Sequence, residues 1–133
     1  MTLLLLDTTF LVDAARGTAD LDDLIGDDDD VSIAAITVAE LTAGVELAGP
    51  RHRARRRDYV DEVVSSLPIL PHDEAVASQH AGLLVAVRAG RPRGAHDLII
   101  AATAVAAGRT IVSADRRAFG DLPGVEAIDH RAG

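Results

Sequence analysis

The sequence of 133 residues contains no cysteine and no tryptophan, and it has one tyrosine and two phenylalanines. Without cysteine the chain has no disulfide, no thiolate zinc site and no cysteine nucleophile, which is compatible with a reducing compartment. The scarcity of aromatic rings argues against a surface on which successive nucleic-acid bases stack. The apolar 48% of the chain is therefore mainly Ala, Val, Leu and Ile, and we predict an α/β core of small side chains.

Lysine is also absent, so all 13 basic residues are arginines. The chain also contains 21 acidic residues, so its formal net charge is −8. A negative chain is poorly suited to coat nucleic acid by charge alone. It remains compatible with an enzyme that holds phosphate through metal ions.

Apolar runs long enough to cross a bilayer are missing as well. The N-terminal stretch MTLLLLD lacks a basic segment and meets an acid after four leucines, so it predicts a strand and not a signal peptide. The length fits one domain. We therefore expect a single domain over residues 1–133, cytoplasmic and without a membrane segment.

Apolar runs and helical patterns alternate along the chain. Strands are predicted over 3–6, 31–36, 68–70, 110–113 and 125–128, and helices from about 8, over 19–25, 37–48, 51–67 and 75–89, from about 97 to Gly108, and in a turn ending at 119. Thr8 or Thr9 and Thr37 are predicted to cap the helices that they precede. The continuous apolar run of the first strand is typical of a parallel strand covered on both faces. The alternation predicts an α/β fold on a mainly parallel sheet.

Four acids stand where these elements meet: Asp7, Glu40, Asp97 and Asp115. Asp7 and Asp115 follow predicted strands, and Asp97 begins a helix. Glu40 lies within one helical turn of Ile36 and Leu41, on a face that should pack inward. Each aspartate alone is typical of a helix N-cap. Right-handed crossovers between parallel strands, however, would bring all four acids to one edge of the sheet.

Carboxylates that gather without arginine between them repel one another, and a divalent ion resolves that repulsion. Mg²⁺ or Mn²⁺ prefers oxygen ligands, and such an ion suits phosphodiester hydrolysis. Ser113, two residues before Asp115, is predicted either to orient a water at this site or to cap the turn. No two histidines form a close metal-binding pair, and we retain only His96, beside Asp97, as a substrate contact.

The motifs LLLLDTT at Asp7, TVAEL at Glu40, AHDLIIAATAVAAG at Asp97 and IVSADRRAF at Asp115 together resemble PIN-domain ribonucleases of the VapC toxin type. They occur in the usual order over nearly the whole chain. The resemblance implies an α/β/α sandwich, RNA cleavage that depends on Mg²⁺ or Mn²⁺, a homodimer, and inhibition by a VapB-type antitoxin whose tail enters the acidic groove. It assigns the metal-binding and catalytic roles to the four acids, with Thr8 and Ser113 in supporting roles.

A phosphatase, a signalling domain and an inactive binding module are the alternatives to this interpretation. A haloacid-dehalogenase-type phosphatase needs a second acid two residues after the first, and Thr9 stands there. A receiver-type signalling domain needs a late lysine, which this chain lacks. A catalytically inactive PIN-fold module that binds RNA or protein would lose acids of the quartet, whereas all four are present.

Two arginine clusters and one small-residue surface are further candidates for binding. Arg88, Arg91 and Arg93 precede Asp97, and we predict that they contact RNA together with His96. A second cluster is equally consistent with RNA binding and with a solvated face, a dimer contact or an antitoxin contact. It consists of Arg51, Arg53, Arg55, Arg56 and Arg57. A partner helix is expected on exposed small residues: Ala14, Ala15, Ala43, Gly44 and Ala48.

Overall fold

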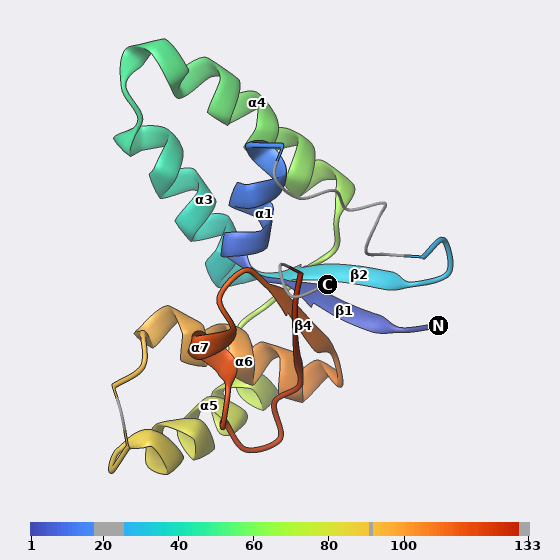
Figure 1. Cartoon of the computed structure of the whole chain (residues 1–133), viewed down its shortest axis with the longest axis vertical. Helices are drawn as coiled ribbons and strands as arrows, with labels where there is room; N and C mark the ends of the chain where they lie inside the picture. The colour runs from blue at the N-terminus through green and yellow to red at the C-terminus, as the bar shows by residue number, and fades with distance from the viewer. Residues whose placement is uncertain (18–25, 91, 131–133) are drawn as a thin grey trace.

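Five parallel strands form one sheet in the order β3-β2-β1-β4-β5 (Figure 1). The computed structural model describes residues 1–17, 26–90 and 92–130. The strands are β1 (Leu3–Leu6), β2 (Asp30–Ala34), β3 (Ile69–Leu70), β4 (Thr110–Ser113) and β5 (Ala127–Asp129). The prediction of a mainly parallel sheet is confirmed.

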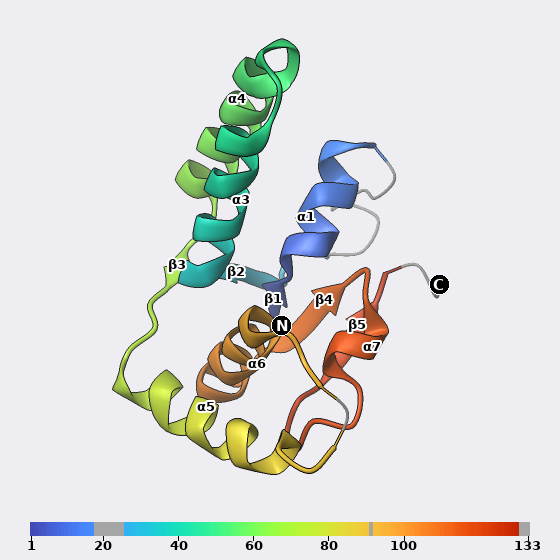
Figure 2. The same cartoon turned by 90° about the vertical axis from the view of Figure 1, so that its left-hand side faces the viewer.

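Helices cover both faces of the sheet, as Figures 1 and 2 show. One layer consists of α1 (Thr8–Ala15), α3 (Ala35–Leu47) and α4 (Pro50–Ser66), and the other of α5 (Glu74–Val87), α6 (Ala95–Ala107) and α7 (Arg116–Phe119). Helices α3 and α4 run side by side and project beyond the sheet. The arrangement is the expected α/β/α sandwich.

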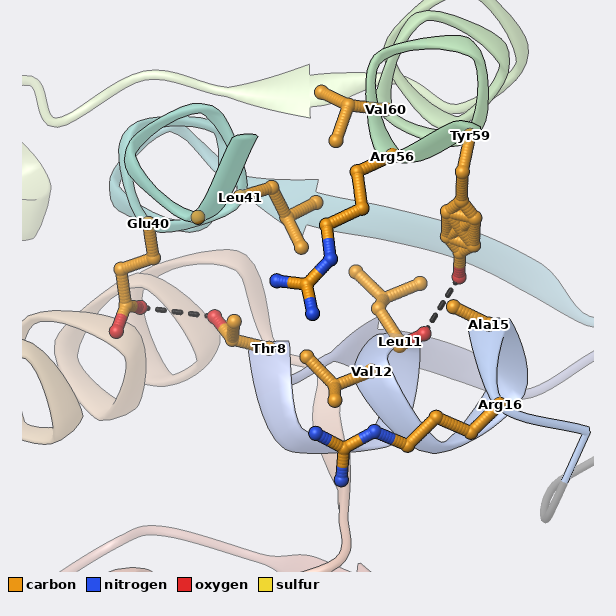
Figure 3. A pocket seen from close by; sticks show the side chains of 11 residues that line it. Thr8, Leu11, Val12, Ala15, Arg16, Glu40, Leu41, Arg56, Tyr59 and Val60 are labelled. Carbon is orange, nitrogen blue, oxygen red and sulfur yellow. Dashed lines mark hydrogen bonds between the residues drawn. The ribbon is translucent and has the colours of Figure 1, made fainter. Parts of the chain in front are cut away.

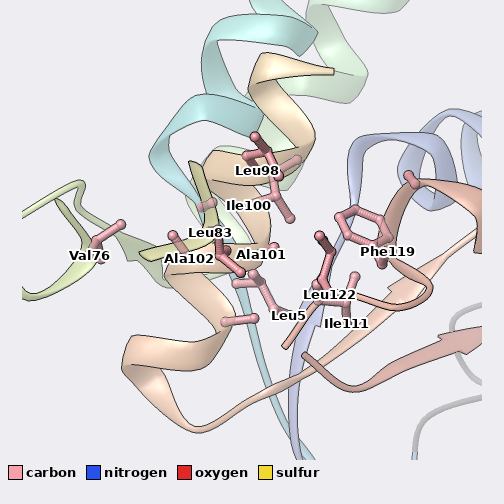
Figure 4. Close-up of a cluster of buried hydrophobic side chains, with 13 residues drawn as sticks. Leu5, Val76, Leu83, Leu98, Ile100, Ala101, Ala102, Ile111, Phe119 and Leu122 are labelled. Carbon is pink, nitrogen blue, oxygen red and sulfur yellow. The ribbon is translucent and has the colours of Figure 1, made fainter. Parts of the chain in front are cut away.

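The four leucines at the start of the chain explain why both faces are covered. Leu4 and Leu6 belong to the apolar cluster under α1, α3 and α4, whereas Leu5 belongs to the cluster under α5 and α6. Successive side chains of a strand point to opposite faces, so an uninterrupted apolar run needs a layer on each side. The second cluster, drawn in Figure 4, includes Ala101 and Ala102 of α6, both fully buried. Their small size lets α6 lie close to the sheet.

Several element boundaries differ from the predictions. Strand β2 ends at Ala34, which is the N-cap of α3, so Thr37 lies inside the helix and is fully buried. The N-cap of α1 is Asp7, without a capping bond from its side chain. The predicted caps at Thr8, Thr9 and Thr37 are therefore wrong. The predicted helix over 19–25 lies outside the described residues.

The order of the strands reverses at β1, which has β2 on one side and β4 on the other. In open parallel sheets, ligands bind at the carboxyl ends of the strands beside such a reversal. Asp7 follows β1 at this point, and Asp115 follows β4 with one residue, Ala114, between them. Gly108 ends α6 in the predicted left-handed conformation, with φ of 65°. No helix in the described part of the chain is long and apolar enough to span a membrane.

Candidate functional site

Asp7 is a buried carboxylate held by hydroxyl groups. Its side chain is 2% exposed, and its Oδ2 accepts hydrogen bonds from Thr9 Oγ1 at 2.7 Å and from Ser113 Oγ at 2.9 Å. Thr9 Oγ1 also accepts from the amide of Ala114 at 3.0 Å, which ties the start of α1 to the loop after β4. These bonds fix the orientation of Asp7 without any positive charge.

Glu40 points from α3 toward the start of α1. Thr8 Oγ1 donates to Glu40 Oε1 at 2.9 Å (Figure 3) and lies 3.4 Å from Thr37 Oγ1. The other carboxylate oxygen of Glu40 is 3.4 Å from His96 Nδ1. Thr8 therefore supports Glu40, and the exposed ring of His96 lies at the rim of the site.

Asp115 connects β4 to α7. Its amide donates to Ser113 Oγ at 2.9 Å, and its Oδ1 accepts from the amide of Arg117 at 3.1 Å. The second bond satisfies an amide in the first turn of α7, as an N-cap does. Ser113 thus contacts both Asp7 and the Asp115 segment, so it supports two acids at once.

Asp97 lies in the first turn of α6, three residues after the N-cap Gly94. A Cβ atom on Gly94 would lie 2.8 Å from Asp97 Oδ2, a distance shorter than Cβ atoms show to non-bonded atoms in real proteins. The absence of a side chain at Gly94 therefore leaves the space that the Asp97 carboxylate occupies.

The pKa of Asp97 depends first on burial and then on the charges of the other three acids. Burial raises the pKa of Asp97 from its ordinary 3.8 to about 6, and the negative charges of Asp7, Asp115 and Glu40 add to this increase, while His96 opposes it. Burial also raises the pKa of Asp7, although hydrogen bonds from Thr9 and Ser113 and from the Thr8 amide oppose the change. The structure thus brings the predicted acids together.

The donor set fits a hard divalent cation. Four carboxylates supply the oxygen ligands that Mg²⁺ and Mn²⁺ prefer, and their mutual repulsion is the charge that such an ion would neutralise. Among the described residues, no three acids or histidines already lie close enough to hold an ion. Ligation by the set would therefore involve side-chain rotation or water molecules between ion and carboxylate, and Mg²⁺ usually keeps several waters.

The predicted RNA contacts differ in exposure and in hydrogen bonding. Arg88 is exposed at the end of α5, and Arg91 lies outside the described residues. Arg93 donates to three main-chain carbonyls near the end of α7. The predicted RNA contacts at Arg88, Arg91, Arg93 and His96 remain predictions.

The cluster at the start of α4 is partly explained by α3. Arg57 pairs with Glu46 at 2.7 Å, and Arg53 donates to the carbonyls of Glu46 and Ala48. Carbonyls at the end of a helix attract cations, so these two arginines stabilise the corner between α3 and α4.

A pocket of about 150 Å³ lies between α1, α3 and α4 and opens beside Thr8 and Glu40 (Figure 3). Ala15 and Gly44, both part of the predicted small-residue surface, line it. Ala43 is exposed, but Ala48 is 8% exposed and belongs to the interior. The expectation that Ala48 is exposed is wrong, because the chain turns there between α3 and α4.

Comparison with protein families gives a match to the PIN domain model over residues 4–125. The match covers most of the chain and includes all four acids. The chain belongs to the PIN domain family. No curated protein sequence matches it.

Solved structures confirm the resemblance to VapC-type PIN domains. FitAcB from Neisseria gonorrhoeae is 30% identical, with a TM-score of 0.78 over 96% of this chain and 98% of that one. VapBC-5 of the VapBC toxin–antitoxin family, from Mycobacterium tuberculosis, is 29% identical, with a TM-score of 0.79 and the same coverage. VapBC2 from Rickettsia felis, bound to a DNA fragment from its promoter, has a TM-score of 0.85 at 23% identity and 96% and 98% coverage, and supports the fold alone.

Sequence reasoning misses two features of this PIN domain site. Thr9 is predicted as a cap and argues against a phosphatase, but it contacts Asp7. Gly94 belongs to a basic loop in the sequence pattern, but it provides space for Asp97. The proximity of Thr9 to Asp7 in the sequence is the one signal that points to the first feature.

Proposed function

We propose that this PIN domain is a metal-dependent endoribonuclease, the toxin of a toxin–antitoxin pair. The observation that carries the proposal is geometric: Ser113 bonds both to Asp7 and to the amide of Asp115. Glu40 faces His96, the neighbour of Asp97, so the four acids lie around one edge of the sheet. Family membership and similarity to toxin–antitoxin structures support it. The family match also removes the phosphatase and receiver alternatives, and leaves an inactive PIN-fold binding module as the alternative.

The four acids would hold Mg²⁺, or Mn²⁺ in its place. When bound, the ion would lower the pKa of a water and neutralise charge on the phosphoryl oxygens of RNA. Thr9 and Ser113 keep Asp7 in one orientation, and Thr8 does the same for Glu40. His96, exposed beside Glu40, would donate a hydrogen bond to RNA at the rim.

The test is incubation of purified protein with a defined RNA pool and Mg²⁺ or Mn²⁺. We expect cleavage that chelator abolishes and that Asp97→Asn loses. Asp61→Asn is the matched control, because Asp61 is an exposed carboxylate on α4. Full activity of Asp97→Asn, or cleavage in chelator, would contradict the proposal. Metal-independent RNA binding without cleavage would favour the inactive module.

A VapB-type antitoxin is the proposed partner, and the pocket between α1, α3 and α4 is its proposed docking site. Thr8 and Glu40 line this pocket, so a chain bound there would reach the acids and exclude RNA. Partners of this type accompany the toxins in the VapBC structures. The check is a short reading frame beside this one, whose co-expressed product should bind the protein and relieve growth arrest. Absence of such a frame, together with normal growth on expression alone, would contradict the toxin assignment.

A homodimer completes the proposed assembly. Light scattering on the purified protein should give twice the mass of the 13.9 kDa chain. A monomer at micromolar concentration would overturn this part of the proposal and leave the nuclease assignment unaffected.

A further inference from the structure

Arg93 directs its hydrogen bonds to the main chain near α7. Its Nη1 donates to the carbonyl of Ala118 at 3.1 Å and to that of Arg117 at 3.4 Å, and its Nη2 donates to the carbonyl of Gly120 at 2.6 Å. Helix α7 has four residues, so its carbonyls lack partners within the helix. The guanidinium supplies partners to two of them, Arg117 and Ala118, and to Gly120 just beyond the helix.

The two ends of this contact belong to the two segments that carry Asp97 and Asp115. Arg93 directly precedes Gly94, the N-cap of α6, and Asp97 lies in the first turn of that helix. Helix α7 begins directly after Asp115, whose Oδ1 accepts from the amide of Arg117. One side chain therefore connects the backbone before one acid to the backbone after another.

The segments need such a connection because their acids repel. Below them, Leu98 of α6 and Phe119 of α7 pack in one apolar cluster (Figure 4). Apolar contact is non-directional and does not by itself set the distance between two loops. Hydrogen bonds from a planar guanidinium are directional and fix geometry.

We propose that Arg93 is a positioning residue that holds the Asp97 and Asp115 segments at the spacing that the divalent ion requires. This inference rests on the proposed function and assigns Arg93 a role in place of the predicted phosphate contact. A guanidinium bonded to three carbonyls lies among acceptors, which do not attract phosphate. Lysine would replace it poorly, because a single ammonium cannot reproduce the planar fork.

The experiment is calorimetric titration of Mn²⁺ into wild type, Arg93→Ala and Arg93→Lys, at a temperature where circular dichroism shows each protein folded. Loss of a group that orients metal ligands typically weakens binding by about 10–100-fold. We expect about tenfold weaker Mn²⁺ binding for Arg93→Ala and partial recovery for Arg93→Lys. Arg88→Ala removes the same charge from an exposed position and should keep the Mn²⁺ affinity of the wild type.

Hydrogen exchange on the metal-free proteins gives a second readout. Amides of residues 117–122 should exchange faster in Arg93→Ala than in wild type, whereas those in β1 should not change. Mn²⁺ affinity of a folded Arg93→Ala within about twofold of wild type, against the tenfold expected, would overturn the inference. Wild-type protein that binds no Mn²⁺ would instead overturn the proposed function, and unchanged exchange in 117–122 would show that Arg93 does not hold α7.

Discussion

Hydroxyl groups support two of the acids of this site, Asp7 and Glu40. Thr9 and Ser113 donate to Asp7, and Thr8 donates to Glu40. A hydroxyl orients a carboxylate without neutralising it, so the negative charge stays available for a metal ion. Burial raises the pKa of Asp97, and the negative charges of Asp7, Asp115 and Glu40, which the hydroxyls leave in place, add to this increase.

Asp97→Asn should therefore stabilise the metal-free protein near pH 7. The folded protein binds the Asp97 proton more tightly than the unfolded chain does, so its stability falls as pH rises from about 3.8 to about 6 and stays lower above that range. Because the side chain is half-buried and screened by solvent, we expect a gain of about 1 kcal/mol. The measurement is urea denaturation of both proteins across this pH range.

The difference between the variant and wild type should shrink as pH falls from about 6 toward 4. Saturating Mg²⁺ should also remove it, because the ion binds the folded wild type. A gain that is the same at pH 4 and pH 7 would exclude ionisation of Asp97 as its cause.

At the scale of elements, the acids lie at the starts of α1 and α6, on α3 and in the turn into α7, and the strands align these elements. Helix α6 carries Asp97 at one end and Gly108 at the other. Between them, Ala101, Ala102 and Ala104 are buried. A helix packed this closely to the sheet holds its first turn firmly, and the N-cap Gly94 then decides where the Asp97 carboxylate can lie.

Gly94→Ala should weaken Mn²⁺ binding by about tenfold while the fold is retained. The backbone of Gly94, with φ of −63°, accepts alanine, but the added Cβ would lie 2.8 Å from Asp97 Oδ2 and displace the carboxylate. Gly49→Ala is a matched control, because Gly49 is the N-cap of α4 with φ of −64° and nothing within 4 Å of its Cβ position.

Both variants should melt within a few degrees of wild type, since they change a cap in the same way. Titration calorimetry gives the Mn²⁺ affinity. Equal affinities for Gly94→Ala and Gly49→Ala would contradict the proposed role of Gly94.

Across the whole molecule, arginines offset part of the acidic charge and leave a net charge of −8. Several are committed to the fold. Arg53 and Arg57 bind the end of α3, Arg93 binds the α7 segment, and Arg109 pairs with Asp30 at 2.6 Å. Attraction of RNA then depends on the exposed arginines, and among the described ones Arg88 is nearest in sequence to Asp97.

Arg88→Ala should weaken RNA binding uniformly and flatten its salt dependence. Removal of one phosphate interaction with a single strand lowers the log–log slope by about 0.7. The measurement is RNA affinity across a salt series in the inactive Asp97→Asn background. Arg93→Ala in the same background should keep the original slope, and an unchanged slope for Arg88→Ala would reject Arg88 as a phosphate contact.

The local sequence pattern was sufficient to predict the strands that precede Asp7 and Asp115 and the end of the helix that carries Asp97. The bounds of β1 and β4 and the end of α6 agree with prediction, because a buried parallel strand needs an unbroken apolar run and a helix end in the left-handed region favours glycine. Asp7 follows β1 directly, and Asp115 follows β4 after Ala114. Parallel topology then brings them to one edge, so the acidic site could be predicted without coordinates.

Only the tertiary structure decided which partner each polar side chain takes. Thr8 and Thr9 stand where a helix cap is expected, yet they bind Glu40 and Asp7. A hydroxyl serves a main-chain amide or a carboxylate equally well, and the choice depends on groups distant in the sequence, such as Glu40, 32 residues from Thr8.

The arginines show the same division between sequence and structure. Sequence identifies a charge beside Asp97, but the carbonyls that Arg93 binds lie 24 to 27 residues away. Likewise, the arginines at the start of α4 are unfavourable for that helix alone, and the end of α3 beside them offsets this for Arg53 and Arg57. Local sequence specifies which groups are charged, whereas packing decides which of those charges remain free to meet RNA.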